Sequence, residues 1–315
     1  MPRNPLQVQY TRGELAESEH RVHALWVDEH GRDVEAWGDS GRLVCPRSCL
    51  KPVQALPLVL SKAFESAPDP LAAVAIACAS HKGQPLHLEF VESWLKNLGR
   101  HEDDLVCAPQ RSRRIDNNCS GKHTGFLAAC GALGFETRGY HEWTHPLQSQ
   151  IRDLAGALSG MDWHKLPYGT DGCGIPTYHL PLNMFAKLMS TFLRPEKSAY
   201  GEALALIHRA WTAAPMMVAG KDALGSELAR VTQGRVIVKV GAQGNYFALD
   251  FKNGRALVLK AEDGGERAAE ESLLSLLLRA SAITEGEDRA LRAYVPREIR
   301  NWAGDVTGTS RVLFS

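Results

Sequence analysis

The N-terminal part of the chain alternates between apolar and polar positions. Within residues 21–38, Leu25 and Val27 occupy every second position before Gly31, and Val34 resumes the alternation after it. A period of two places successive side chains on opposite faces of a strand, and glycine suits the turn between two strands. We therefore expect a β-hairpin in this segment.

The middle of the chain changes to the spacing of helices. Residues 50–64 follow Pro46 and are apolar at helical spacing, and Ser48 stands where a helix N-cap is expected. Residues 71–79 are almost wholly apolar, which predicts a buried helix that ends at Ser80. The same spacing predicts further helices at 86–98, 123–133, 145–158, 178–193, 200–212 and 222–231.

Strand patterns return near the end of the chain, where Gly254 marks a hairpin turn. One sheet built from strands of both ends and flanked by helices satisfies this order most simply. We predict the α/β (α+β) class, with one domain over residues 1–315 that has room for an inserted all-helical lobe. The alternating segments, and the helix that follows them, are 235–240, 245–251, 256–260 and 266–283.

Composition narrows the class of protein. The 315 residues include 36 basic and 36 acidic ones, so the net charge gives no reason to expect a nucleic acid or an anionic membrane as partner. The longest apolar run, 71–79, is far shorter than the roughly 20 residues that span a bilayer. Residues 1–20 hold no apolar core of a signal peptide. We expect a cytoplasmic protein whose seven cysteines remain thiols.

The candidate catalytic side chains begin with Ser48 and Lys51. Their i, i+3 spacing at a helix start places both side chains on one face. A serine attacks an acyl carbon when a base takes its proton, and a lysine can be that base when burial or a second cation lowers its pKa. The same spacing recurs at Ser93 and Lys96, in the middle of an amphipathic segment, and there we interpret it as structural.

Two further fragments supply a serine and a lysine. Ser80 follows the apolar run and precedes His81 and a nearby glycine, a pattern that is also typical of an ordinary helix end. Lys239 lies in a strand pattern and is followed by Gly241, and such Lys-x-Gly strands line the cleft of serine enzymes that carry Ser-x-x-Lys. The order of these pieces favours a hydrolase in which lysine activates serine.

A possible metal site forms the last group. Cys119 is followed by a hydroxyl, an amine and an imidazole arranged around a glycine, and Cys173 lies in a similar glycine-flanked stretch. Two thiolates with one or two N or O ligands would suit zinc, with His123 or a neutral Lys122 as the third ligand. Asp171 could orient a ligand by a hydrogen bond. The alternative is a pair of free core thiols without a metal.

Taken together, these motifs resemble the rhizobial-type L-asparaginases. The resemblance extends from about residue 10 to Asn301-Trp302-x-Gly304 near the end of the chain. The motifs are Arg47-Ser48-x-x-Lys51-Pro52, Ala79-Ser80-His81, Asn118-Cys119-Ser120-Gly121-Lys122-His123, Asp171-Gly172-Cys173-Gly174-x-Pro176 and Lys239-x-Gly241-Ala242.

The resemblance implies hydrolysis of L-asparagine to L-aspartate and ammonia, by a homodimer with a fold similar to serine β-lactamases and glutaminases. It also implies a Zn²⁺ ion beside the substrate. The implied Ser–Lys pairs are Ser48 with Lys51 and Ser80 with Lys239, and the implied metal ligands are Cys119, Lys122 and Cys173. We assign contacts with the substrate to Arg47, His81, Ser120, His123 and Gly241.

One position departs from the family pattern, and several alternatives stay open. Gln243 stands where a glutamate is expected, which alters the charge near Lys239 or the substrate preference. Ser48 is our preferred nucleophile and Ser80 its rival. Glutaminase activity is a further alternative, because glutamine is one methylene longer than asparagine. A pocket distinguishes two substrates that differ by one methylene by only about 1–3 kcal/mol. A penicillin-interacting enzyme would share the Ser-x-x-Lys motif but would need export, and a zinc or redox-sensing module would leave the serines and lysines unexplained.

Overall fold

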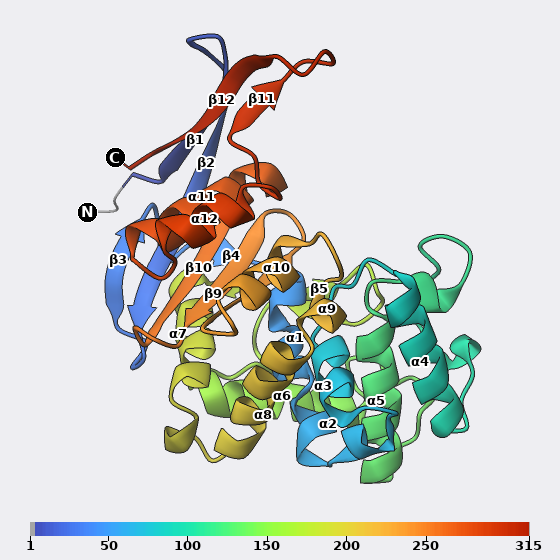
Figure 1. Cartoon of the computed structure of the whole chain (residues 1–315). Coiled ribbons are helices and arrows are strands. Elements are labelled where there is room, and N and C mark those ends of the chain that lie inside the picture. Colours follow the sequence, from blue (N-terminus) through green and yellow to red (C-terminus); the bar gives the residue numbers. More distant parts are fainter. Residues whose placement is uncertain (1–3, 315) are drawn as a thin grey trace. The chain divides into compact units, whose positions relative to one another are not determined.

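The computed structural model describes residues 4–314, which form two compact units (Figure 1). The first unit holds the residues up to Pro46, the segment Leu180–Leu193 and the residues from Val231 onward. The second holds Arg47–His179 and Arg194–Arg230. The expectation of one domain over residues 1–315 stays a prediction.

An antiparallel sheet built from both ends of the chain forms the first unit. Its strands follow the order β11-β12-β1-β2-β10-β9-β8, and β3 pairs with β2. The predicted α/β (α+β) class, with a sheet of N- and C-terminal strands flanked by helices, is thereby confirmed. The strands span β1 Leu6–Arg12, β2 Leu15–Asp28, β3 Asp33–Trp37, β8 Val236–Gly241, β9 Asn245–Asp250, β10 Arg255–Ala261, β11 Glu298–Arg300 and β12 Val306–Leu313.

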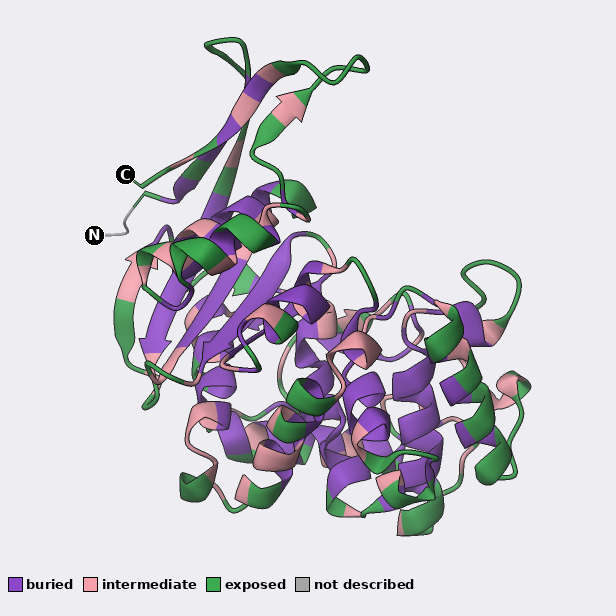
Figure 2. Cartoon of the chain, in the orientation of Figure 1, coloured by how far each residue is buried: buried purple, intermediate pink, exposed green. Residues whose placement is uncertain are grey.

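The core of this unit lies between the central strands and two helices. Every residue of β9 is buried, as Figure 2 shows for the central strands. The helix α11 (Glu266–Arg279) contacts β10, β9 and β2, and α7 (Leu182–Ser190) contacts the same three strands. Glu285–Leu291 forms the short helix α12, and the two-residue strands β4 (Leu43–Val44) and β7 (Leu180–Pro181) pair with each other.

Helices dominate the second unit. The helix α3 packs against α5 and α8, and its residues 72–77 are all buried, as the apolar run predicts. The helices are α1 Lys51–Gln54, α2 Leu56–Leu60, α3 Pro70–Ala77, α4 Pro85–Asn97, α5 Ser120–Leu133, α6 Pro146–Ser159, α8 Gly201–Ala213, α9 Pro215–Val218 and α10 Leu224–Val231. A small hairpin joins β5 (Tyr168–Thr170) to β6 (Pro176–Tyr178).

Two expected helices are wrong in part, and proline explains both. Residues 50–64 do not form one helix: a 3₁₀ turn over Arg47–Leu50 leads into the short helices α1 and α2, whose first turns contain Pro52 and Pro57. Proline lacks the N–H that a continuous helix needs. For the same reason the helix expected over 178–193 begins only at Leu182, after Pro181. No helix within residues 4–314 has the length and apolar character to cross a membrane.

Candidate functional site

A strained turn carries Ser48. The preceding residue, Arg47, has a φ of 53°, in the left-handed region that side chains other than glycine rarely adopt. The guanidinium of Arg47 binds the carboxylate of Asp171: Nε donates to Oδ2, and Nη2 lies 3.4 Å from Oδ1. Backbone strain of this kind costs about 1–3 kcal/mol and is concentrated at functional sites. The ion pair holds the turn, and with it the half-buried Ser48, in this conformation.

Lys51 is almost completely buried, with 1% of its surface exposed. Its Nζ donates a hydrogen bond to the carbonyl oxygen of Ala79 and lies 3.0 Å from the hydroxyl oxygen of Ser80. The structure thus brings Lys51 onto Ser80, whereas the sequence paired Lys51 with Ser48. Ser48 lies on the turn that leads directly into α1, and its pairing with Lys51 stays a prediction.

Backbone hydrogen bonds fix the segment that contains Ser80. The amide of Ser80 donates to the carbonyl of Val218 at 3.0 Å, and the amide of Lys82 donates to that of Ala219 at 3.1 Å. Nζ of Lys82 donates to the carbonyl of Asp222 at 2.6 Å. The segment after α3 is therefore held at several points by the end of α9 and the loop that follows it.

His81 has both ring nitrogens occupied within the protein. The Ser120 hydroxyl donates to the carbonyl of Ile115 (2.9 Å), so it accepts from Nε2 of His81 (3.0 Å). Nδ1 of His81 accepts from the amide of Gly83 (3.2 Å). Burial, then the neighbouring His87 and Lys51, lower the pKa of His81 well below its ordinary value. A neutral, fully bonded imidazole favours a supporting role for His81, and the substrate contacts assigned to His81 and Ser120 stay predictions.

His123 also lies in the interior. Its ring is fully buried, and Nδ1 accepts from the hydroxyl of Tyr140 at 2.7 Å, since that hydroxyl itself accepts from the amide of Val106 at 2.9 Å. Burial and the charges of Lys122 and Lys51 lower the pKa of His123 well below its ordinary value. Its assigned contact with the substrate stays a prediction. Tyr140 was not foreseen, because a tyrosine between a glycine and a histidine carries no recognisable spacing.

Cys119, Lys122 and Cys173 lie together in the second unit. Nζ of Lys122 lies 3.0 Å from Sγ of Cys173, and Cys173 is hydrogen-bonded to Cys119. The hydrogen bond from Cys173, aided by the charges of Lys51 and Lys122, lowers the pKa of the Cys119 thiol well below its usual value, while Cys173 keeps its proton. Burial opposes the charge on Lys122, but the two sulfurs and Asp171 outweigh it and raise the pKa of Lys122. One thiolate and one ammonium therefore compensate each other.

Asp171 and Cys173 stand at the tip of the β5–β6 hairpin. Although burial opposes ionisation of Asp171, the hydrogen bond from Arg47 and the charge of Lys122 hold the pKa of this carboxyl below its usual value. The carboxylate thus lies between two cations, one from the Ser48 turn and one from α5. It connects the serine part of the site to the thiol part.

The donor set can be compared with what zinc requires. Two sulfurs and one amine already contact one another, and zinc accepts such soft and nitrogen ligands. Within residues 4–314 no three His, Cys, Asp or Glu side chains are placed to hold a metal, so a lysine would have to complete this set. Binding would require Lys122 to lose its proton. The donor chemistry of Cys119, Lys122 and Cys173 is thus compatible with zinc, and zinc binding stays a prediction.

Gly121 stands at the centre of this motif for a reason that the sequence did not reveal. It lies in the first turn of α5, not in a tight turn, and a Cβ added there would come within 2.7 Å of the carbonyl oxygen of Ile76 in α3. Close approach of two helices therefore requires glycine. This contact sets the position of the neighbouring Lys122.

Lys239, Gly241 and Gln243 belong to the first unit. Lys239 is buried in β8, and its Nζ donates to the carbonyl of Val240 at 2.8 Å. The proposed pairing of Lys239 with Ser80, like the substrate contact assigned to Gly241, joins residues of both units and stays a prediction. Gln243 and Gly244, with φ of 65° and 66°, form the centre of the β8–β9 hairpin turn. Gln243, the residue that departs from the family pattern, therefore occupies a turn position with a left-handed backbone.

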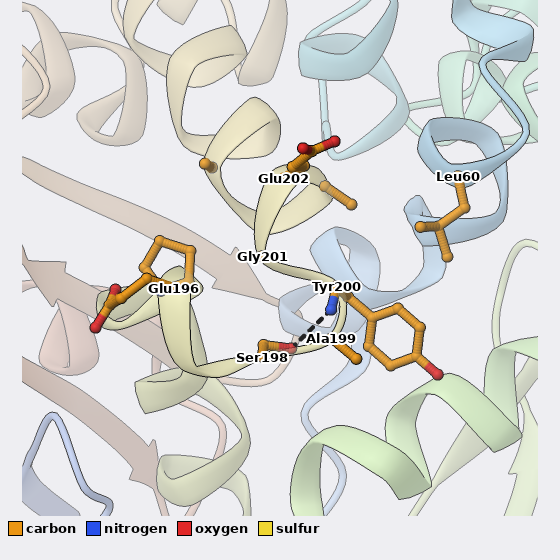
Figure 3. Close-up of a pocket in the computed structure, with 10 residues that line it drawn as sticks. Leu60, Glu196, Ser198, Ala199, Tyr200, Gly201 and Glu202 are labelled. Carbon is orange, nitrogen blue, oxygen red and sulfur yellow. Dashed lines mark hydrogen bonds between the residues drawn. The ribbon is translucent and has the colours of Figure 1, made fainter.

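The second unit also contains a hollow of about 560 Å³, drawn in Figure 3. It is lined by Leu60, Tyr200 and neighbouring residues of 195–205. None of the candidate site residues contributes to this lining. We therefore seek the chemistry of the chain in the serine, lysine and thiol groups described above.

Comparison with known proteins identifies the class of the chain. The family model described as L-asparaginase II matches residues 8–312, nearly the whole chain. The protein belongs to the L-asparaginase II family. This confirms the resemblance drawn from the motifs. It also indicates that the protein is an amidohydrolase that acts on a small molecule. No curated protein matches the chain significantly.

Solved structures similar to the chain include serine β-lactamase-like and penicillin-binding-protein-like folds. A β-lactamase from Mycobacterium bovis is 17% identical, with a TM-score of 0.44, over 83% of this chain and 95% of that one. An octameric penicillin-binding protein homologue from Pyrococcus abyssi is 11% identical, with a TM-score of 0.39, over 81% of this chain and 73% of that one. We infer no activity from these likenesses.

Proposed function

We propose that this protein hydrolyses L-asparagine to L-aspartate and ammonia through an acyl-enzyme formed on serine. The observation that carries the proposal is the buried amine of Lys51, which lies 3.0 Å from the Ser80 hydroxyl. Lys51 begins α1, directly after the 3₁₀ turn that contains Ser48. Membership of the L-asparaginase II family supplies the substrate class. We expect the enzyme to act in the cytoplasm as a homodimer.

Ser48 is the proposed nucleophile. Its hydroxyl oxygen attacks the side-chain amide carbon of the substrate, and the amine of Lys51 accepts the hydroxyl proton. The C–N bond then breaks, and the ammonium of Lys51 returns the proton to the departing ammonia. Water cleaves the resulting ester and restores the serine. Backbone N–H groups of the turn that carries Ser48 can stabilise the oxyanion.

The remaining residues position the catalytic groups or would hold the metal ion. Ser80 holds the amine of Lys51 in place, and Arg47 and Asp171 keep the Ser48 turn in its strained conformation. A zinc ion held by Cys119, Lys122 and Cys173 would supply a Lewis acid that helps to orient the α-amino and α-carboxylate groups of the substrate.

Two experiments test this proposal. Ammonia release from L-asparagine and L-glutamine is measured for the purified protein and for the variants Ser48→Ala and Ser80→Ala. The variant Ser93→Ala, at an exposed serine, is the control. Loss of release in Ser48→Ala but not in Ser93→Ala is the expected result, and faster release from glutamine would favour the glutaminase alternative. Trapping the acyl-enzyme and locating the label by mass spectrometry decides the nucleophile. Label on Ser80 alone would contradict the role given to Ser48.

A further inference from the structure

The hairpin that carries Asp171 and Cys173 has little support of its own. Its strands β5 and β6 have three residues each and, among residues 4–314, pair only with each other. Two backbone bonds close the tip, from Asp171 to Ile175 and from Gly174 to Asp171, both 2.8 Å. An isolated two-stranded hairpin is marginally stable in water. Its placement must therefore come from side chains, both at the tip, where Asp171 binds Arg47 and Cys173 contacts Lys122, and at the base.

An aromatic stack supplies that support at the start of β5. The ring of Tyr168 stacks on the indole of Trp143, with centroids 3.8 Å apart and planes 14° apart. Tyr168 is 53% exposed, so the stack is formed at the surface. Its partner across the hairpin, Tyr178, is buried and contacts Trp163 edge-on at 5.0 Å. The base of the hairpin is thus held by one exposed and one buried ring.

A buried cation completes the stack. The guanidinium carbon of Arg152 on α6 lies 3.9 Å from the centroid of the Trp143 ring, and only 3% of Arg152 is exposed. Its Nε donates to Nδ1 of His164 at 3.2 Å, and Nε2 of His164 lies 2.8 Å from Asp153. A buried guanidinium needs compensation, and here the indole face provides part of it. The indole is therefore held from α6 while it holds Tyr168.

We propose that Trp143, Arg152 and Tyr168, which we call the hairpin clamp, position Cys173 and Asp171 for metal binding and catalysis. Their ring and cation contacts run to one another and to the base of the hairpin, so they are positioning residues. The part that concerns activity rests on the proposed function. Because the two short strands alone do not hold the tip in place, loosening the base weakens the contacts of Cys173 with Lys122 and of Asp171 with Arg47.

Tyr168 allows a sharp test, because truncation of a half-exposed side chain does not open the core. We compare Tyr168→Ala with Tyr168→Phe, which keeps the stacked ring, and with Leu60→Ala, a control at another partly exposed apolar position of the same unit. Three quantities are measured: zinc affinity by competition with a chromophoric chelator, kcat/KM for asparagine, and the rate at which an alkylating reagent labels Cys173 in metal-free protein.

The clamp predicts a specific pattern. Tyr168→Ala should lose about tenfold in zinc affinity and in kcat/KM, the size found when groups that orient metal ligands are removed, and should label Cys173 about tenfold faster. Tyr168→Phe and Leu60→Ala should match the unchanged protein in all three. Equal labelling rates in Tyr168→Ala and Leu60→Ala would overturn the proposal. If the unchanged protein releases no ammonia, the proposed function fails, and the labelling rates still decide whether the clamp positions the hairpin.

Discussion

Lys51 and Ser80 are 29 residues apart in sequence, yet the amine of the first lies 3.0 Å from the hydroxyl of the second. Two different elements produce this contact: Lys51 begins α1, and Ser80 follows the end of α3. The carbonyl of Ala79 accepts a second hydrogen bond from the same amine. One lysine therefore connects the Ser48 turn with the Ser80 segment.

Replacement of Lys51 by methionine should reduce kcat for asparagine by about 10²–10⁴-fold, the usual contribution of a general base. The side chain keeps most of its volume, so the buried position remains filled. The matched control is Lys96→Met, because Ser93 and Lys96 repeat the spacing of Ser48 and Lys51 on the exposed face of α4. Ammonia release measures both, and a similar loss in the two variants would contradict the assignment.

Gly121→Ala should lower the free energy of unfolding by about 1–3 kcal/mol, the usual cost of overpacking. The added methyl group would meet the backbone of Ile76, so α5 must shift and Lys122 with it. Gly131→Ala lies in the same helix with open space around it, and should stabilise by about 0.5–1 kcal/mol. Urea unfolding of both variants measures the difference, and equal effects would refute the close-contact explanation.

The stacked pair His81 and His87 should make the protein less stable in mild acid. Their rings are 4.8 Å apart, and burial lowers the pKa of each below the ordinary value near 6.5. The unfolded chain then binds more protons than the folded one, so the free energy of unfolding falls as pH decreases from about 6.5 toward the folded pKa values.

Urea unfolding at several pH values between 5 and 8 measures this dependence. His87→Gln should show a shallower slope, because one depressed histidine is gone while an amide can still donate to the carbonyl of Met216, the acceptor of Nε2. A slope identical to that of the unchanged protein would show that His87 does not contribute.

Gln243→Gly should raise the free energy of unfolding by about 1 kcal/mol. Gln243 adopts a φ of 65° in a hairpin turn whose next residue, Gly244, is also left-handed. A side chain in this conformation costs about 1–2 kcal/mol, which glycine avoids. Thermal unfolding measures the gain, with Gln233→Gly (φ 53°) as a second left-handed position. A lower melting temperature for Gln243→Gly would mean that contacts of the side chain outweigh the strain.

Sequence patterns were sufficient to predict those helices, strands and turns that are determined by nearby residues. The alternation around Leu25, the apolar run that became α3 and the glycine turn at Gly254 each depend on neighbours a few residues away. Local patterns also explain why residues 50–64 do not form the single helix that was expected. Pro52 and Pro57 lack the backbone N–H that a continuous helix needs, so the helix is interrupted although the apolar spacing is regular. The motifs likewise identified the family, since residue identity alone carries that information.

Tertiary structure decided which groups meet. Sequence spacing paired Lys51 with Ser48, but only the fold brings its amine within hydrogen-bond distance of Ser80, 29 residues later. The same holds for His81, whose two nitrogens are occupied by Ser120 and Gly83, and for the support that Trp143 gives to Tyr168. Hydrogen bonds and ring contacts act over a few ångströms, whereas the residues that form them are distant in the chain. The sequence by itself therefore determined the elements and the kinds of chemical group, and the fold determined their partners.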